Sequence, residues 1–279
     1  MKNIWYRFYK NKLAFAGFVI LMIFVILAVF APLIAPYDPF KMNPDKMLKA
    51  PSLNHWFGTD QFGRDILSRV IYGSRISFKV GIISVGISLL IGTTMGIFAG
   101  FYGGIIDGII SRIMDVMFSF PHILLALVIM AILGANLTNL MIAIGIVYIP
   151  IFGRIARGSV MSIKDNLYIE AADSIGVHNF IIMWRHILPN ILAPVIVQTT
   201  LSFGFAIRAE AALSFLGLGV EPDVPSWGIM LNEGKDWMEM AWWVAVYPGV
   251  AATLAILSFN VLGDGLRDAL DPKLKNESE

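Results

Sequence analysis

The sequence predicts an all-α integral membrane protein with about six transmembrane helices. Hydrophobic residues make up 57% of the chain and charged residues only 15%, whereas a soluble globular domain carries about 25% charged residues. So few charges would not cover the surface of a soluble protein of 279 residues. The apolar residues are also gathered in long runs, and a helix that crosses a bilayer needs about 20 of them. We therefore expect most of the outer surface to face lipid.

Six apolar runs are long enough to be spanning helices. The third and fourth are separated only by a short polar turn, Gly134-Ala135-Asn136. No internal repeat, low-complexity tract or Pro/Ser-rich linker divides the chain, so we expect a single membrane domain with an N-terminal extension. The six expected spans are residues 13–35, 80–101, 113–134, 137–153, 191–216 and 241–263.

The first apolar run resembles a secretory signal peptide, because basic residues precede it. It extends from Leu13 to Ala31, however, and the apolar region of a signal peptide spans only roughly 7–15 residues. Pro32 follows the run, and no small-x-small cleavage site does. We therefore expect an uncleaved first span. Over residues 1–12 we expect an interfacial helix, because aromatic rings alternate there with cations.

Lysine and arginine near the helix ends indicate the orientation, because they favour the cytoplasmic side. Four basic residues and no acidic residue precede the first span, so we expect both the N-terminus and, after six spans, the C-terminus in the cytoplasm. Loop 154–190 is then also cytoplasmic, while 36–79 and 217–240 face outward. The expected parts are an N-terminal interfacial segment, first transmembrane helix and extracytoplasmic loop (1–73), a transmembrane core (74–268) and a cytoplasmic tail (269–279).

Glycine recurs every four residues in the second expected span. This spacing places small residues on one helix face and lets another helix backbone approach closely. We favour close packing as the interpretation, with a pore-lining role as the alternative. Prolines also interrupt several spans, where neighbouring helices can satisfy the backbone groups left free. The residues concerned are Gly92, Gly96, Gly100 and Gly104, and Pro121, Pro150, Pro194 and Pro248.

Two pairs of ionisable residues fall within the expected spans or at their edge. Inside a span a charge costs about 2.5–3.5 kcal/mol and marks a functional candidate. Arg112 and Asp115 are three residues apart, so we expect an ion pair on one helix face. Arg208 and Glu210 lie toward the outer end of the fifth span and are two residues apart, so they do not face each other. We consider them for the translocation path or its gate, with structural pairing to other helices as the alternative.

No pattern typical of catalysis or metal binding is present. The four histidines are scattered, and no His-Glu-x-x-His or Gly-x-Ser-x-Gly motif occurs. Residues 228–235 read Gly-x-x-x-x-x-Gly-Lys, but a phosphate-binding loop has four intervening residues followed by Ser or Thr. Here there are five, and Asp236 follows. We therefore expect no catalytic residue, no metal site and no nucleotide site in this chain.

Loop 154–190 is the most informative segment, and its composition predicts two short helices. We expect Asp165 to cap the first helix and Gly176 to end it, because glycine tolerates the left-handed conformation of a helix C-terminus. The second is expected to begin near His178 and to stop at Pro189. A folded helix pair at a membrane surface is typical of a docking surface, while a merely ordered loop is the alternative.

The loop resembles the conserved loop motif of the permease subunits of ABC importers. That motif reads Glu-Ala-Ala, three residues, Gly, nine residues, Ile, one residue, Leu-Pro. The chain has Glu170-Ala171-Ala172, Gly176 and Leu188-Pro189 in this spacing, with His186 in place of Ile. This departure is common in the dipeptide/oligopeptide/nickel branch of the family, which the sequence is similar to over roughly residues 55–273.

Further segments are similar to the same branch and follow in the same order. They are Gly58-Thr59-Asp60, Gly63-Arg64-Asp65, Ser68-Arg69, Ser119-Phe120-Pro121, residues 213–219, Pro225-Ser226-Trp227-Gly228 and residues 268–272. Singly these are weak signals, but together they are specific.

The resemblance implies a type I ABC-importer permease fold and a bacterial or archaeal cytoplasmic membrane. It implies a second homologous permease subunit, with this chain as the second of a heterodimeric pair, two cytoplasmic ATPase subunits and an extracytoplasmic solute-binding protein. ATP and Mg would be bound by the ATPases, and no cofactor by this chain. The loop would couple to an ATPase through Glu170, Ala171, Ala172, Gly176, Leu188 and Pro189.

The resemblance leaves the solute open among dipeptides, oligopeptides, glutathione, nickel chelates and peptide antibiotics. A secondary transporter is one alternative, but it would be expected to carry midplane sites on repeated broken helices. A channel, which would conduct without partners, is another. An intramembrane enzyme would need a catalytic pair at depth, and the sequence offers none.

Overall fold

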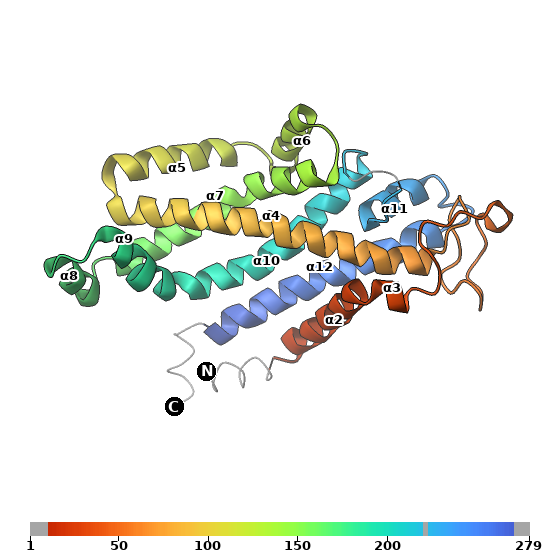
Figure 1. The fold of residues 1–279 in the computed structure, drawn as a ribbon, viewed down its shortest axis with the longest axis horizontal. Coiled ribbons are helices and arrows are strands. Elements are labelled where there is room, and N and C mark those ends of the chain that lie inside the picture. Colours follow the sequence, from red (N-terminus) through yellow and green to blue (C-terminus); the bar gives the residue numbers. More distant parts are fainter. Residues whose placement is uncertain (1–10, 220–222, 271–279) are drawn as a thin grey trace.

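The computed structural model describes residues 11–219 and 223–270, which form one elongated helical bundle (Figure 1). Within these residues the chain is helical apart from turns, loops and an isolated bridge between Thr59 and Asp65, so the all-α prediction is confirmed. The interfacial helix expected over 1–12 and the tail expected over 269–279 lie almost entirely outside the described residues. The elements are α2 (Lys12–Val29), α3 (Ala31–Ile34), η1 (Pro44–Lys46), α4 (Ile66–Tyr102), α5 (Gly104–Phe118), α6 (His122–Leu133), α7 (Leu137–Ile163), α8 (Leu167–Ser174), α9 (Asn179–Ile181), the π-helix η2 (Ile182–Ile187), α10 (Leu188–Phe215), α11 (Trp227–Lys235) and α12 (Trp243–Leu270).

Five helices in the described part of the chain are long and apolar enough to cross a membrane, or six spans if the bent pair α5–α6 is counted as one. The third expected span, 113–134, is therefore wrong as a single straight helix, because α5 and α6 meet at 92°. The break falls at Ser119-Phe120-Pro121. Proline lacks a backbone N–H and disfavours the helical conformation in the residue before it, so the helix ends before Pro121.

The second expected span is longer than predicted. Helix α4 has 37 residues and begins at Ile66, so residues 66–79 of the expected outer loop are helical. It packs along α7, and the predicted glycine stripe forms this contact. A Cβ atom on Gly100 would lie 2.9 Å from the Arg157 carbonyl oxygen, and Cβ atoms on Gly92 and Gly96 would overlap α7 backbone atoms. Gly104 lies outside the contact and begins α5.

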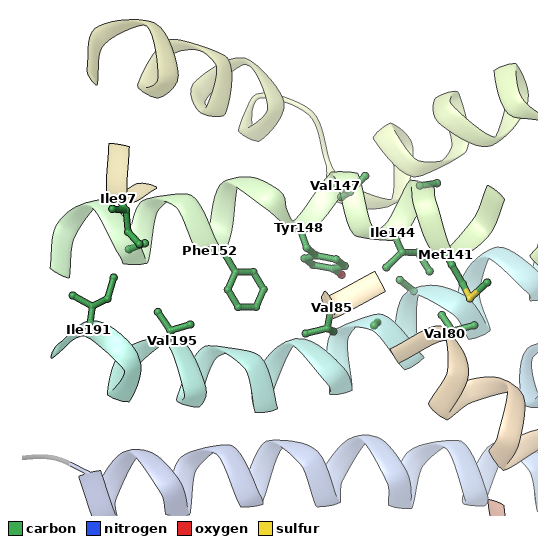
Figure 2. Close-up of a cluster of buried hydrophobic side chains, with 14 of the residues drawn as sticks. Val80, Val85, Ile97, Met141, Ile144, Val147, Tyr148, Phe152, Ile191 and Val195 are labelled. Atoms are coloured by element: carbon green, nitrogen blue, oxygen red, sulfur yellow. The ribbon is translucent and has the colours of Figure 1, made fainter. Parts of the chain in front are cut away.

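The main hydrophobic core lies between α4, α7 and α10. Figure 2 shows Tyr148 and Phe152 pointing from α7 toward α10, with Ile191 and Val195 of α10 facing them. The same cluster continues into the 167–187 segment. Burial of apolar surface is worth about 25 cal/mol per Å², so this contact stabilises the attachment of that segment to the spans.

The end of the bundle that carries α3 and α11 is held together by buried opposite charges, which the sequence did not predict. Arg64 donates from Nε to Asp60 at 2.6 Å and from Nη2 to Glu233 at 2.9 Å. Arg69 donates from Nη2 to the same Glu233 carboxylate at 3.4 Å. Both guanidinium groups are shielded from solvent. Since a buried charge is tolerated only when it is paired, these contacts hold the start of α4 against α11.

Candidate functional site

The loop predicted to dock a partner projects from the end of the bundle opposite α3 and α11 (Figure 1). Its first helix is α8, which begins at Leu167. The prediction that Asp165 caps this helix is wrong: Asn166 occupies the N-cap position, and its side chain makes no capping hydrogen bond. The predicted end is confirmed, because Gly176 follows the helix with a φ angle of +76°.

The second helix of the loop does not stop at Pro189, contrary to the prediction. Helix α9 leads through the π-helix η2 directly into α10, so that Pro189 lies in the first turn of α10. A proline ring clashes with the carbonyl group four residues earlier in an α-helix, and here that residue, Arg185, lies in the wider π-helical turn. The Asn190 side-chain amide donates a hydrogen bond of 2.6 Å to the nearby carbonyl oxygen of His186.

One side of α8 is an exposed apolar surface with a single carboxylate at its edge. Leu167 and Ile175 are 83% and 81% exposed. Glu170 is exposed, and within the described residues its side chain has neither an ion pair nor a hydrogen bond. We call this surface the coupling face, and it consists of Leu167, Tyr168, Glu170, Ala171 and Ile175.

The opposite side of α8 anchors it to the bundle. Ile169 and Ala172 are buried, and they belong to the same hydrophobic cluster as Ile182, Met183 and Ile187. The segment is thus a rigid extension of α7 and α10. A surface that is apolar, exposed and firmly held is typical of an interaction site.

Two ion pairs connect α7 to α5, and neither is the predicted one. Asp115 pairs with Arg154 at 2.8 Å and not with Arg112. Asp107 accepts hydrogen bonds from Arg157 at 2.5 and 2.6 Å. A basic residue that precedes an acidic one on the same helix is the less favourable order. Arg154 instead reaches Asp115 from α7, and its guanidinium carbon lies 4.1 Å from the centre of the Phe118 ring of α5.

Arg208 and Glu210 point in different directions, as expected from their spacing. Glu210 is fully buried and accepts a hydrogen bond of 2.9 Å from the Ser214 hydroxyl. Arg208 is exposed, and its guanidinium carbon lies 5.1 Å from the centre of the Phe205 ring. Twenty residues of α10 separate Arg208 from Leu188, roughly 30 Å at 1.5 Å per residue. The structure therefore does not bring these two residues to the coupling face.

No group of three or more His, Asp or Glu side chains within the described ranges is arranged to hold a metal ion. The described residues instead present an exposed apolar surface on α8 and an exposed arginine, Arg208, on α10.

The sequence matches the models of known protein families over most of its length. Residues 92–276 match the family described as binding-protein-dependent transport system inner membrane component. Residues 1–51 match the N-terminal TM domain of oligopeptide transport permease C.

Two curated relatives cover nearly the whole chain. The dipeptide transport system permease protein DppC of Alkalihalophilus pseudofirmus is 51% identical over 267 residues, which are 96% of this chain and 88% of the relative. The glutathione transport system permease protein GsiD of Pectobacterium atrosepticum is 44% identical over 276 residues, which are 99% and 92% of the two chains.

Solved structures show the same fold. A chain of the MetNI methionine ABC transporter, in inward-facing conformations, matches 74% of this chain and 98% of its own length with a TM-score of 0.59 and 17% identity. A chain of an amino acid ABC transporter with histidines matches 72% and 94% with a TM-score of 0.56.

These findings define the class of protein: the chain belongs to the inner membrane components of binding-protein-dependent ABC importers. Within that family it is a permease of the peptide branch, as the loop motif predicts. ATP hydrolysis in such importers takes place on partner ATPases, and a binding protein delivers the solute. The chain is thus a multi-pass protein of the bacterial inner membrane, and the secondary-transporter and channel alternatives are not supported.

Proposed function

We propose that this chain is the second permease of a heterodimeric importer for peptides or a related small solute. Its relatives DppC and GsiD are named for dipeptide and glutathione transport, and both solutes are small peptides with free carboxylates. A homologous but distinct permease would complete the translocation path. An extracytoplasmic binding protein would deliver the solute, and two cytoplasmic ATPases would drive its passage.

The observation that carries this proposal is the coupling face. Its exposed apolar residues are suited to a groove on an ATPase, and the free Glu170 carboxylate is suited to a cation or backbone amides at the rim of that groove. Ala171 allows close approach, while Ala172 packs inward and fixes the depth of the helix. Gly176 sets the turn into the second helix, and Leu188 and Pro189 begin the span that receives the motion.

The proposed orientation places the coupling face and both chain termini in the cytoplasm. The α11 end, with its buried charge cluster, then faces outward, where the binding protein docks. ATP and Mg are bound by the ATPases in this scheme, and no cofactor is bound by this chain. We further propose that Arg208 lies on the translocation path and that the buried Glu210 supports it from behind by fixing α10.

The proposal is tested by expressing the chain with its partner permease, ATPases and binding protein and reconstituting the complex. A stable complex should form and should import a dipeptide, an oligopeptide or glutathione only with ATP inside and loaded binding protein outside. Uptake that persists without the ATPases would contradict the proposal and would favour a channel or a secondary transporter.

A further inference from the structure

Arg208 is a cation on a face of α10 that lipid would not tolerate. It is exposed, and no acidic side chain in the described part of the chain pairs with it. Among the helices packed against α10, α4, α6 and α7 carry no acidic residue, and Glu233 of α11 pairs with Arg64 and Arg69. The acids of α12 lie in its last two turns, and Glu210 of α10 itself is buried. A lone charge within a span is costly in hydrocarbon and faces either protein or water. This face of α10 is therefore turned away from lipid.

A row of stacked aromatic rings leads away from Arg208. The Phe205 ring carries the guanidinium group and stacks on Tyr148 of α7, with ring centres 6.3 Å apart. Tyr148 stacks in turn on His122 of α6 at 5.6 Å. The face of an aromatic ring attracts a guanidinium, and a guanidinium has five N–H groups to donate in hydrogen bonds. The row joins α6, α7 and α10.

The row lies at the break between α5 and α6. Tyr148 is eleven residues from the start of α7 at Leu137, which is roughly 16 Å along the helix. The bend of 92° between α5 and α6 falls beside His122. The Nε2 atom of His122 is shielded from solvent and has no hydrogen-bond partner in the described structure. The row therefore has a second polar group, besides Arg208, that could bind a polar solute.

We propose that Arg208, held on this row of rings, binds the terminal carboxylate of the peptide as it crosses the membrane. A planar guanidinium matches a carboxylate through two parallel hydrogen bonds, and the neighbouring rings provide apolar contacts for side chains of any type. Every linear peptide has one terminal carboxylate whatever its sequence, so this contact is compatible with a varied set of solutes. The inference rests on the proposed function as a peptide importer and adds the group of the solute that the path recognises.

The test compares Arg208→Gln with the wild type in the reconstituted complex, with one tripeptide supplied either as the free acid or as the C-terminal amide. Each is delivered at saturating loaded binding protein, so that delivery does not limit the rate. Loss of a charge-assisted hydrogen bond predicts that Arg208→Gln slows the acid about tenfold and leaves the amide unchanged. Arg75→Gln is the matched control, because Arg75 is also exposed and also lies over a ring, that of Tyr72, but outside the row.

Equal slowing of both peptides by Arg208→Gln would overturn the inference and would indicate that Arg208 pairs with an acid of the partner permease. Unchanged rates for both would overturn it as well. A wild-type complex that imports neither these peptides nor a dipeptide, an oligopeptide or glutathione would instead contradict the proposed function itself.

A second measurement uses only the wild type, in case Arg208→Gln does not assemble. A tripeptide with a photoreactive diazirine next to its free C-terminus should cross-link to α10 around residues 205–209. The same group at the N-terminus should not. Cross-links from the C-terminal probe that avoid this part of α10 would overturn the inference.

Discussion

Arg64 donates a hydrogen bond of 2.9 Å to Glu233 across 169 positions of sequence, and Arg69 shares the same carboxylate. Removing one member of a buried ion pair leaves the other charge uncompensated and costs about 3–5 kcal/mol. Because Glu233 balances two buried arginines, we expect Glu233→Gln to lower the thermal unfolding temperature of the purified complex clearly. The measurement is unfolding followed by intrinsic fluorescence in detergent.

The control for this change is Glu239→Gln, because Glu239 is exposed a short distance beyond α11 and has no ion pair within the described residues. It should unfold at nearly the wild-type temperature. Equal shifts for the two variants would show that the buried cluster does not hold this end of the bundle.

The contact between α4 and α7 depends on glycine. A Cβ atom on Gly96 would meet the Gly153 carbonyl oxygen and the Ala156 side chain. We therefore expect Gly96→Val to force α4 and α7 apart and to destabilise the protein by about 1–3 kcal/mol. Gly86→Ala on the same helix is the control, since a Cβ atom there has nothing within 4 Å. Comparable unfolding temperatures for the two variants would contradict the packing described.

The proposed orientation can be measured directly, because the chain has no cysteine. Leu53 is 95% exposed at the α11 end, and Asp165 is exposed beside α8. In cells whose outer barrier is permeabilised but whose inner membrane is intact, an impermeant maleimide should label Leu53→Cys. It should label Asp165→Cys only after the inner membrane is opened. The reverse pattern would invert the whole topology and remove the coupling face from the cytoplasm.

Local features of this fold could be predicted where a residue acts through its own backbone or its own helix. Gly176 is an example, because its left-handed conformation ends α8 regardless of distant contacts. The glycine stripe is another, since helical periodicity alone places Gly92, Gly96 and Gly100 on one face. The break at Pro121 had a local signal too, but the continuous apolar run over 113–134 outweighed it.

Features that depend on the tertiary fold were not predictable. The sequence placed Arg69 in the outer loop 36–79, yet it is buried in α4, where it pairs with Glu233 far along the chain. The pairing of Asp115 with Arg154 similarly requires α5 and α7 to lie side by side. The prediction that Glu170 contacts an ATPase rests on the resemblance to ABC-importer permeases, because periodicity alone left open whether the loop docks a partner.

The central claim is that the coupling face transmits to the spans the conformational change that ATP hydrolysis drives in the ATPases. We expect Glu170→Ala to assemble normally but to lose most uptake, because losing one partner of an interfacial charge pair costs about 2–5 kcal/mol. Gly176→Val should also assemble and lose most uptake. A residue with a Cβ atom is destabilised by roughly 1–2 kcal/mol in the left-handed conformation, and the strained turn would move η2 away from α8. The control is Asp165→Ala, an exposed acid just before α8 that caps nothing.

The most direct measurement is solute uptake together with ATPase activity stimulated by loaded binding protein, in proteoliposomes and normalised to assembled complex. The account predicts that both activities fall together in Glu170→Ala and Gly176→Val and remain at the wild-type level in Asp165→Ala. Assembled Glu170→Ala and Gly176→Val complexes that transport at the wild-type rate would contradict it.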